Sequence, residues 1–290
     1  MRGTVAWLDG RWGTPTGLAI PLSDRGLQLA DGVFETVLIH AGRPQLLDAH
    51  HSRWCDGAAL LGMAEPPSIR SLDPLIKDAC RRAELSNGSG ALRLNWSRDG
   101  AEARGIQVPK GDPDPSQHRF WLTLSPHTPS FSAVHAWISR HERRNATSRL
   151  SRCKTFAYGQ AIQARREARE NSAEEALLLS TTGELCCAST ANLLVQRQGE
   201  WLTPPLSSGC LPGIMRQQML NLRLAREEHL GPYPERSDQW LLINSLDCRM
   251  VRSVNGQVLN AGVDAAALWR RLLAKGTPPE QGSRGQTLRN

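Results

Sequence analysis

Residues Leu22 to Thr36 read LSDRGLQLADGVFET. This stretch lies within residues 4–40, where short apolar runs alternate with Asp, Gly and Pro, so we expect short strands around turns. Moving outward, residues 48–62 (DAHHSRWCDGAALLG) predict a helix with Asp48 as its N-cap, and residues 70–84 predict a second helix. The N-terminal third therefore predicts strands covered by two helices.

The segment GALRLNWSR alternates apolar and polar residues with the period of two that is typical of a half-buried strand. Its polar face carries Arg93, Asn95 and Ser97. FWLTLS predicts the next strand, and PHTPSFS, with two prolines in seven residues, predicts a linker. We therefore expect a small N-terminal domain over residues 1–126, a larger domain over 127–274 and a disordered tail over 275–290.

The second half intersperses strands and helices. In chain order we expect a strand at VHAWIS, a basic loop, Lys154 followed by a helix through about residue 170, and strands at EALLLS and LCCASTANLLV. A helix at 214–229, a strand at QWLLIN, a hairpin at Asn255-Gly256 and a last helix at 263–274 follow. The order has no strict βαβ rhythm. A two-domain, mixed α+β fold is therefore favoured over a doubly wound parallel sheet.

Composition narrows the class of protein. The chain has 290 residues, a formal net charge of +7 and 40% hydrophobic residues, and no apolar run is long enough for a membrane span or a secretion signal. The basic residues are spread out and are nearly all arginine, which favours a small anionic substrate over nucleic acid. Seven cysteines without a CxxC pair indicate neither a disulfide framework nor a metal site, so we expect a reducing cytoplasm.

Lysine is rare, and one of the four lysines stands apart. Lys77 lies in a predicted helix, Lys110 in a loop and Lys275 at the C-terminal end, whereas Lys154 stands between a polar loop and the apolar helical start TFAYGQAIQA. An amine at such a junction can be partly desolvated, which suits covalent chemistry with a carbonyl. A surface lysine remains the alternative on composition alone.

A second candidate site is LPGIMRQQM, where Pro212-Gly213 precede a predicted helix. The backbone N–H groups of Ile214 and Met215 would point at an anion, helped by the helix dipole. Arg53 in HHSRW could complete an anion cradle, or it could lie on a solvated helix face.

Taken in order, these motifs resemble the class IV pyridoxal-5'-phosphate (PLP)-dependent aminotransferase family. LSDRGLQLADGVFET followed by LLDAHHSRW is similar to the family's N-terminal signature, and Lys154, CASTANLL, TPPLSSGCLPGIMR and NSLDCRMVRSVNG follow in the family's order over residues 5 to about 260. The resemblance implies the D-amino-acid aminotransferase-like fold and PLP as cofactor. It also implies a homodimer.

The resemblance assigns roles residue by residue. Lys154 matches the catalytic lysine that binds PLP as a Schiff base and moves protons. The matches to the cofactor-binding positions are Arg53, Ile214, Met215, Asn244 and Ser245 around the phosphate, Tyr158 near the phenolic oxygen, and Cys187 at the pyridine nitrogen. Phe34 would wall the pocket on the substrate side.

Cys187 departs from the family's pattern. The family usually has a glutamate five residues before the asparagine matched by Asn192, and that carboxylate keeps the pyridine nitrogen protonated. Glu184 lies three residues before Cys187, which along a strand is roughly 10 Å, so it is a doubtful substitute. A neutral cysteine cannot pair with a pyridinium, so we expect transamination to be weakened more than β-elimination.

Within the family, LRLNWSRDGAEARGIQVP resembles the corresponding segment of 4-amino-4-deoxychorismate lyases. That resemblance implies conversion of aminodeoxychorismate to p-aminobenzoate and pyruvate, a folate-precursor reaction, with Arg98 and Arg104 holding the two substrate carboxylates. A D-amino-acid or branched-chain aminotransferase is the alternative activity. A weakly active or non-catalytic PLP-binding homologue is the alternative from another class.

Overall fold

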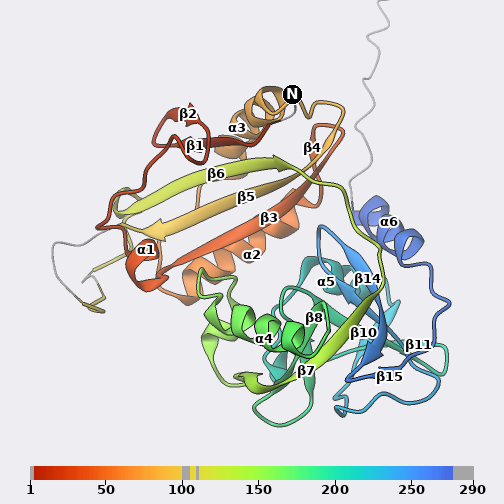
Figure 1. The fold of residues 1–290 in the computed structure, drawn as a ribbon. Helices are drawn as coiled ribbons and strands as arrows, with labels where there is room; N and C mark the ends of the chain where they lie inside the picture. The colour runs from red at the N-terminus through yellow and green to blue at the C-terminus, as the bar shows by residue number, and fades with distance from the viewer. Residues whose placement is uncertain (1–2, 100–104, 109–110, 277–290) are drawn as a thin grey trace, which may run out of the picture.

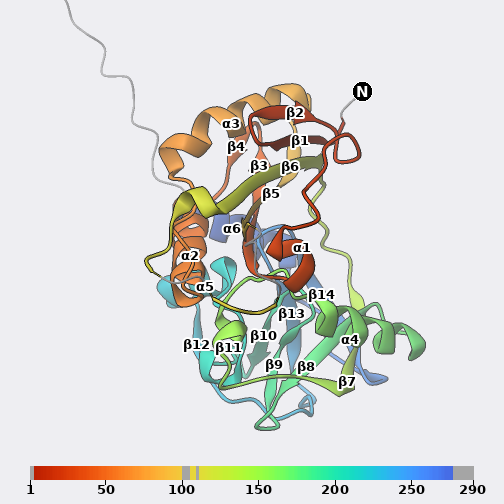
Figure 2. The ribbon, with the colours of Figure 1, turned by 90° about the vertical axis from the view of Figure 1, so that its left-hand side faces the viewer.

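The computed structural model describes residues 3–99, 105–108 and 111–276 and contains two β-sheets. The first sheet, with its helices, forms the upper part of the molecule in Figure 1, and the second forms the lower part. Seen from the side in Figure 2, α1 (Arg25–Leu29) and α2 (Leu47–Leu60) lie at the level where the two parts meet. The fold is the mixed α+β fold that the sequence predicts.

The first sheet has six strands, in the order β2-β1-β6-β5-β3-β4, and all described pairings are antiparallel. The strands are β1 (Val5–Leu8), β2 (Arg11–Gly13), β3 (Gly32–His40), β4 (Arg43–Pro44), β5 (Ser89–Arg98) and β6 (His118–Pro126). Helix α2 packs on β3, and α3 (Ile69–Arg82) packs beside it and against β1. Their apolar faces bury a core that includes Val37, Trp54, Ile76 and Leu122.

The second sheet has nine strands and mixes parallel with antiparallel pairs, the path being β12-β11-β10-β13-β14-β7-β8-β9 with β15 beside β14. Its strands are β7 (Val134–Arg144), β8 (Glu175–Ser180), β9 (Leu185–Ala188), β10 (Asn192–Arg197), β11 (Glu200–Thr203), β12 (Ala225–Glu227), β13 (Gln239–Ile243), β14 (Cys248–Val254) and β15 (Gln257–Val258). Its helices are α4 (Gly159–Glu170), α5 (Ile214–Asn221) and α6 (Ala265–Gly276).

Most expected elements are present, and three details of the prediction are wrong. The N-cap of α2 is Leu46, in the left-handed conformation, so Asp48 lies in the first turn of the helix and not at its cap. LCCASTANLLV is two strands, because the chain turns between Ala188 and Ala191, where the Ala188 N–H donates to the Ala191 carbonyl. The third detail is the helix expected at 214–229.

That helix is shorter than predicted. Helix α5 ends at Asn221, and Arg223 then takes a positive φ of 52°, which a regular helix does not allow. The chain continues into β12, which pairs in parallel with β11. Side-chain periodicity alone could not detect this stop, since neither Gly nor Pro marks it.

The linker predicted near residue 127 lies between β6, which ends at Pro126, and β7, which begins at Val134. This segment runs from the upper to the lower part in Figure 1. Among the described residues, no helix is long and apolar enough to cross a membrane.

Candidate active site

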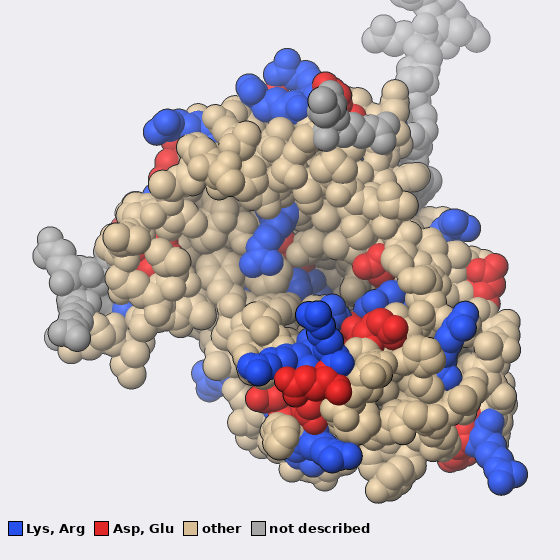
Figure 3. Space-filling model, in the orientation of Figure 1, with Lys and Arg blue, Asp and Glu red and all other residues tan. Residues whose placement is uncertain are grey.

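A cavity of about 590 Å³ lies between the two sheets. The first sheet and its helix contribute Phe34, Thr36, Arg53 and Arg93, and the rest of the wall comes from residues 144–161, the β9–β10 turn, the start of α5 and residues 244–247. Figure 3 shows a hollow between the upper and lower parts, with basic side chains inside it. The inner wall of the cavity therefore carries positive charge among apolar and polar groups.

Lys154 lies in an extended segment that leads from the 3₁₀ turn Arg149–Arg152 toward α4. The Phe34 N–H donates to the Lys154 carbonyl at 2.9 Å, and Val33 forms a bridge with Thr155, so this segment is fastened to the edge of β3. This pairing fixes the backbone of Lys154 at the junction of the two sheets, where its side chain enters the cavity.

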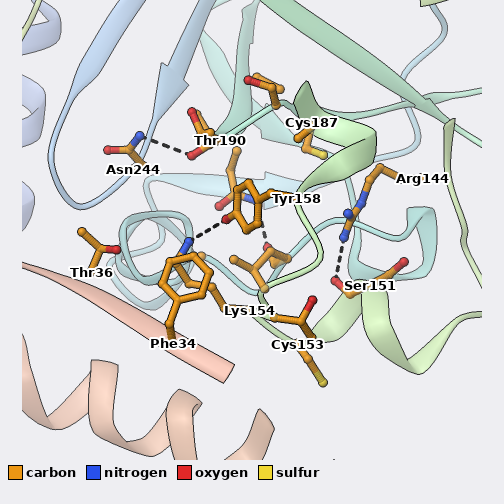
Figure 4. A pocket seen from close by; sticks show the side chains of 18 of the residues that line it. Phe34, Thr36, Arg144, Ser151, Cys153, Lys154, Tyr158, Cys187, Thr190 and Asn244 are labelled. Atoms are coloured by element: carbon orange, nitrogen blue, oxygen red, sulfur yellow. Dashed lines mark hydrogen bonds between the residues drawn. The ribbon is translucent and has the colours of Figure 1, made fainter. Parts of the chain in front are cut away.

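The Lys154 amine is surrounded by aromatic groups. Its Nζ lies 3.0 Å from the Tyr158 hydroxyl and 4.3 Å from the centre of the Phe34 ring. Figure 4 shows these three side chains meeting in the middle of the cavity. Among the described residues, no carboxylate forms an ion pair with Lys154, so the amine is available for covalent chemistry.

An anion-binding end of the cavity is formed where α5 begins. Ile214 and Met215 are the first two residues of the helix and line the cavity, and Gly213, the N-cap, offers no side chain to cap their N–H groups. A Cβ at Gly213 would lie 1.8 Å from Asn192 Oδ1, so this position requires glycine. The amide of Asn192 in turn donates to the Leu211 carbonyl and steadies the loop before the helix. Free N–H groups and the helix dipole together suit a phosphate.

Arg53 reaches the same end of the cavity from α2. Its Nε and Nη2 donate to both oxygens of Glu35 at 2.8 and 2.6 Å, and its Nη1 donates to the Pro212 carbonyl at 3.1 Å. A guanidinium has five N–H donors, so two remain for an anion after these three contacts. Arg53 also ties α2 to the loop that precedes α5.

Glu35 is fully buried and holds Arg53 in place. Burial raises the pKa of Glu35, but the charge of Arg53 and the hydrogen bonds from His50 and Arg53 outweigh burial and lower this pKa to about 2. Burial lowers the pKa of His50, whose Nδ1 lies 2.7 Å from Glu35 Oε2. The ionised carboxylate can only accept, so the neutral imidazole donates its Nδ1–H. A buried ion pair with extra hydrogen bonds fixes the direction of Arg53.

Asn244 and Ser245 also line the cavity. The Asn244 side chain organises the turn, since its Oδ1 accepts from the N–H groups of Leu246 and Asp247 at 2.8 Å each, and its Nδ2 donates to the Thr190 carbonyl at 3.3 Å. Asn244 therefore shapes the wall, while the Ser245 side chain has no such contact within the turn.

Arg93 is a cation of the cavity wall that lies against the same Phe34 ring as Lys154. Its guanidinium lies 3.5 Å above the centre of the Phe34 ring, and its Nε donates to Asn95 Oδ1 at 2.7 Å. Burial lowers the pKa of Arg93, although an arginine remains charged at neutral pH. Among the described residues, no carboxylate forms an ion pair with Arg93, so its guanidinium can bind a carboxylate of a bound molecule.

Cys187 lies at the opposite side of the cavity from Asn244 in Figure 4 and is only 8% exposed. It pairs with Asn192 across the β9–β10 turn. Glu184 does not line the cavity, since its Oε1 accepts from the Ser208 hydroxyl and lies 3.4 Å from His229 Nδ1.

The expectation that Arg98 binds a substrate carboxylate is wrong for this cavity. Arg98 does not line it: its Nε donates to Asp31, its other nitrogens donate to the carbonyls of Leu61 and Gly62, and it is 5% exposed. Arg98 fastens β5 to the end of α2, because all three sides of its guanidinium are used. Arg104 lies outside the described residues.

Sequence reasoning missed three groups in the cavity wall: the guanidiniums of Arg93 and Arg144 and the exposed Thr190. The register of β3 with β5 places Thr36 opposite Arg93 and Phe34 opposite Asn95, so Arg93 shares the cavity face of Phe34. The alternation in β5 marked Arg93 as polar, but only the strand pairing shows what that face covers.

The chain belongs to the class IV aminotransferase family. The family described as Amino-transferase class IV matches residues 32–254, which include Lys154 and all the residues that line the cavity.

Individual relatives are distant. D-alanine aminotransferase of Bacillus licheniformis is 25% identical over 273 residues, which cover 88% of this chain and 89% of that one. The bifunctional aminodeoxychorismate lyase / D-amino acid transaminase of Mycobacterium tuberculosis is 28% identical over 184 residues, or 53% of this chain and 62% of that one. The structure of a hypothetical aminotransferase from M. tuberculosis in its PLP-bound form superposes with a TM-score of 0.78 at 21% identity, covering 94% and 98% of the two chains. This last likeness shows the fold.

Proposed function

We propose that this protein is a PLP-dependent lyase that converts 4-amino-4-deoxychorismate to p-aminobenzoate and pyruvate, a step that supplies a folate precursor. The observation that carries the proposal is the pair formed by Lys154 and Arg93, whose cationic groups lie 4.3 and 3.5 Å from the centre of the same Phe34 ring. An amine that can hold a cofactor thus lies beside a cation that can hold a substrate carboxylate.

The cavity residues fit PLP. The uncapped N–H groups of Ile214 and Met215, the two spare donors of Arg53 and the Ser245 side chain suit its phosphate, and Lys154 Nζ suits its aldehyde. The Tyr158 hydroxyl, 3.0 Å from that amine, suits the phenolic oxygen next to the aldehyde. When bound, PLP withdraws electrons from the carbon that carries the substrate's amine and so makes its proton acidic.

The chain's own residues would then move one proton and orient the substrate. Lys154 Nζ takes the proton from the carbon that bears the amine, with Tyr158 holding the amine in position. The neighbouring C–O bond breaks, the enolpyruvyl group takes up a proton and leaves as pyruvate, and the ring becomes aromatic. Arg93 orients the substrate through a carboxylate, and the aromatic wall of Phe34 and Tyr158 limits water around the amine.

The alternative activity, D-amino-acid transamination, has the same chemical requirements up to the removal of the proton, and D-alanine aminotransferase of B. licheniformis matches most of this chain. Transamination must in addition return the proton to the cofactor, which benefits from a protonated ring nitrogen. The described cavity wall has Cys187, and no carboxylate, at the position that resembles the family's glutamate. This supports the lyase over the transaminase.

The decisive experiment supplies enzymatically made aminodeoxychorismate and measures p-aminobenzoate and pyruvate by chromatography. We expect equal amounts of both products from the wild type and neither from Lys154→Ala. Arg93→Met should raise KM by about tenfold or more, because a charge-assisted hydrogen bond contributes roughly 1.5–3 kcal/mol. Arg81→Met, on the exposed face of α3, is the matched control and should leave KM unchanged. Exchange of amino groups between D-amino acids and keto acids without p-aminobenzoate would overturn the proposal.

A further inference from the structure

The wall around Cys187 differs from the rest of the cavity because it pairs a thiol with a guanidinium. A bulge opposite Leu178 and Leu179 interrupts the β8–β9 pairing at Cys186 and Cys187. Cys187 lines the cavity, and Arg144, at the end of β7, lines it on the same side in Figure 4. In a pyridine ring the nitrogen lies opposite the carbon that carries the aldehyde, so a ring anchored at Lys154 would direct its nitrogen toward this wall.

Arg144 is held firmly and has a free charge. Its Nε donates to the Gly209 carbonyl at 3.2 Å and its Nη2 to the Ser151 carbonyl at 3.1 Å. Within the described ranges, no carboxylate forms an ion pair with it. Two neutral carbonyls therefore fix the guanidinium without cancelling its charge.

The carboxylates near this wall bind other groups and do not pair with Arg144. Glu175 is fully buried and does not line the cavity, since its carboxylate binds Arg165, Arg249 and the Ser189 hydroxyl. Of the described residues that line the cavity, Asp247 alone carries a carboxylate. It lies in the Asn244 turn, across the cavity, and accepts from the Ser130 N–H at 2.7 Å.

The thiols around Cys187 are polarised by their surroundings. The hydrogen bond from Cys186 lowers the pKa of Cys187, and Arg144 acts in the same direction against burial and Glu175. Burial raises the pKa of Cys210, the third thiol of this cluster, to about 12. The Cys187 side chain thus lies in a cluster of thiols and feels the positive charge of Arg144.

We propose that Cys187 and Arg144 together form the subsite for the cofactor's ring nitrogen and keep that nitrogen unprotonated, with the Cys187 thiol donating a hydrogen bond to it. This inference rests on the cofactor binding of the proposed function. It assigns Arg144 a role as a positioning residue whose charge acts on the ring through the shared wall.

Three physical reasons support an unprotonated nitrogen. A pyridine nitrogen is intrinsically less basic than a thiolate, so the proton stays on sulfur when the two compete. A proton taken up from solvent would bring a second positive charge close to Arg144, and the repulsion between like charges opposes this. Moving the proton from Cys187 to the nitrogen would create a thiolate–pyridinium ion pair in a buried wall, at a desolvation cost. In this transfer, the attraction of Arg144 for the Cys187 thiolate is offset by its repulsion of the pyridinium. Arg144 therefore does not favour moving the proton from sulfur to nitrogen.

The consequence is a cofactor that withdraws electrons less strongly than in relatives with a carboxylate at this position. An elimination that ends in an aromatic ring has its own driving force and tolerates this loss. Transamination, which needs a proton delivered to the cofactor, tolerates it less. The subsite would therefore select the type of reaction, whereas Arg93 selects the substrate.

The test reads the nitrogen directly. The wild-type holoenzyme is reconstituted with PLP carrying ¹⁵N in the ring, and the ¹⁵N chemical shift is measured by NMR. We expect the downfield shift of an unprotonated pyridine in the wild type and in Cys187→Ser. We expect a large upfield displacement, the mark of protonation, in Cys187→Glu. An upfield resonance in the wild type would overturn the proposal without any variant having to fold.

A second readout separates this inference from the proposed lyase activity. Amino-group exchange with D-alanine is measured on the same samples, and Cys187→Glu should increase it at least tenfold relative to p-aminobenzoate formation. Cys248→Ser, a buried cysteine outside the cavity wall, is the matched control and should change neither the ¹⁵N shift nor the ratio. A wild-type enzyme that makes no p-aminobenzoate but shows the unprotonated nitrogen would refute the lyase and leave the subsite standing.

Discussion

Glu35→Gln removes the charge that orients Arg53, and its effect can be worked out from the structure. The pKa of Glu35 falls from 4.5 to about 2 in the folded protein, and each tenfold change in acidity corresponds to about 1.4 kcal/mol. The ionised carboxylate therefore contributes about 3 kcal/mol to the free energy of unfolding at neutral pH. This agrees with the roughly 3–5 kcal/mol lost when one partner of a buried ion pair is removed.

The pH dependence has a definite sign because the folded pKa of Glu35 is the lower one. The stabilisation is fully present above the unfolded pKa of 4.5 and is lost as the pH falls toward about 2. The difference in unfolding free energy between wild type and Glu35→Gln should thus be about 3 kcal/mol at pH 7 and shrink progressively below pH 4.5.

The assay is urea denaturation of the apoprotein across this pH range, followed by PLP titration at pH 7. Glu170→Gln is the matched control, because Glu170 forms an exposed pair with Arg166 and should contribute less than about 1 kcal/mol. A loss below about 1 kcal/mol for Glu35→Gln at pH 7, or a loss that does not depend on pH, would refute the reasoning.

Two further substitutions test the cavity. Gly213→Ala would place its Cβ 1.8 Å from Asn192 Oδ1, so we expect it to lower the unfolding free energy by roughly 1–3 kcal/mol and to weaken PLP binding measured by titration. Gly159→Ala is the control, because a Cβ there meets nothing within 4 Å, and it should change neither quantity. Equal PLP affinities of the two variants would contradict the role of Gly213. Tyr158→Phe loses the 3.0 Å hydrogen bond to Lys154 Nζ, worth about 1 kcal/mol, and should shift the pH titration of the bound cofactor's absorbance; an unchanged titration would argue against this contact.

The sequence predicted the fold well where the hydrophobic periodicity of a segment and the turn residues at its ends indicate the same element. The strand β5 and the Asn255-Gly256 hairpin were confirmed, with both turn residues at positive φ, but the alternation of burial in β5 ends at Leu94, since Asn95 and Ser97 on its polar face are buried as well. The β9–β10 turn could not be seen in this way, because Ser189 to Ala191 carry no turn residue with a required φ and the flanking strands form one apolar run.

The order of the motifs along the chain predicted part of the candidate site. Lys154, Arg53 and the start of α5 were named from motifs, and the structure brings them to one cavity. Arg98 was assigned from the resemblance of its segment to aminodeoxychorismate lyases, but it lies five residues after Arg93 in β5 and therefore on the opposite face of the strand. Arg144 is separated from Cys187 by more than forty residues, so no local pattern connects the two.

The central claim is that Lys154 carries the cofactor. The most direct measurement reduces the PLP-loaded protein with borohydride, digests it and maps the modified peptide by mass spectrometry. We predict a phosphopyridoxyl group on Lys154 and none on Lys77, Lys110 or Lys275. Modification of another lysine, or no modification in a protein that retains bound PLP, would contradict the assignment of this cavity as the active site.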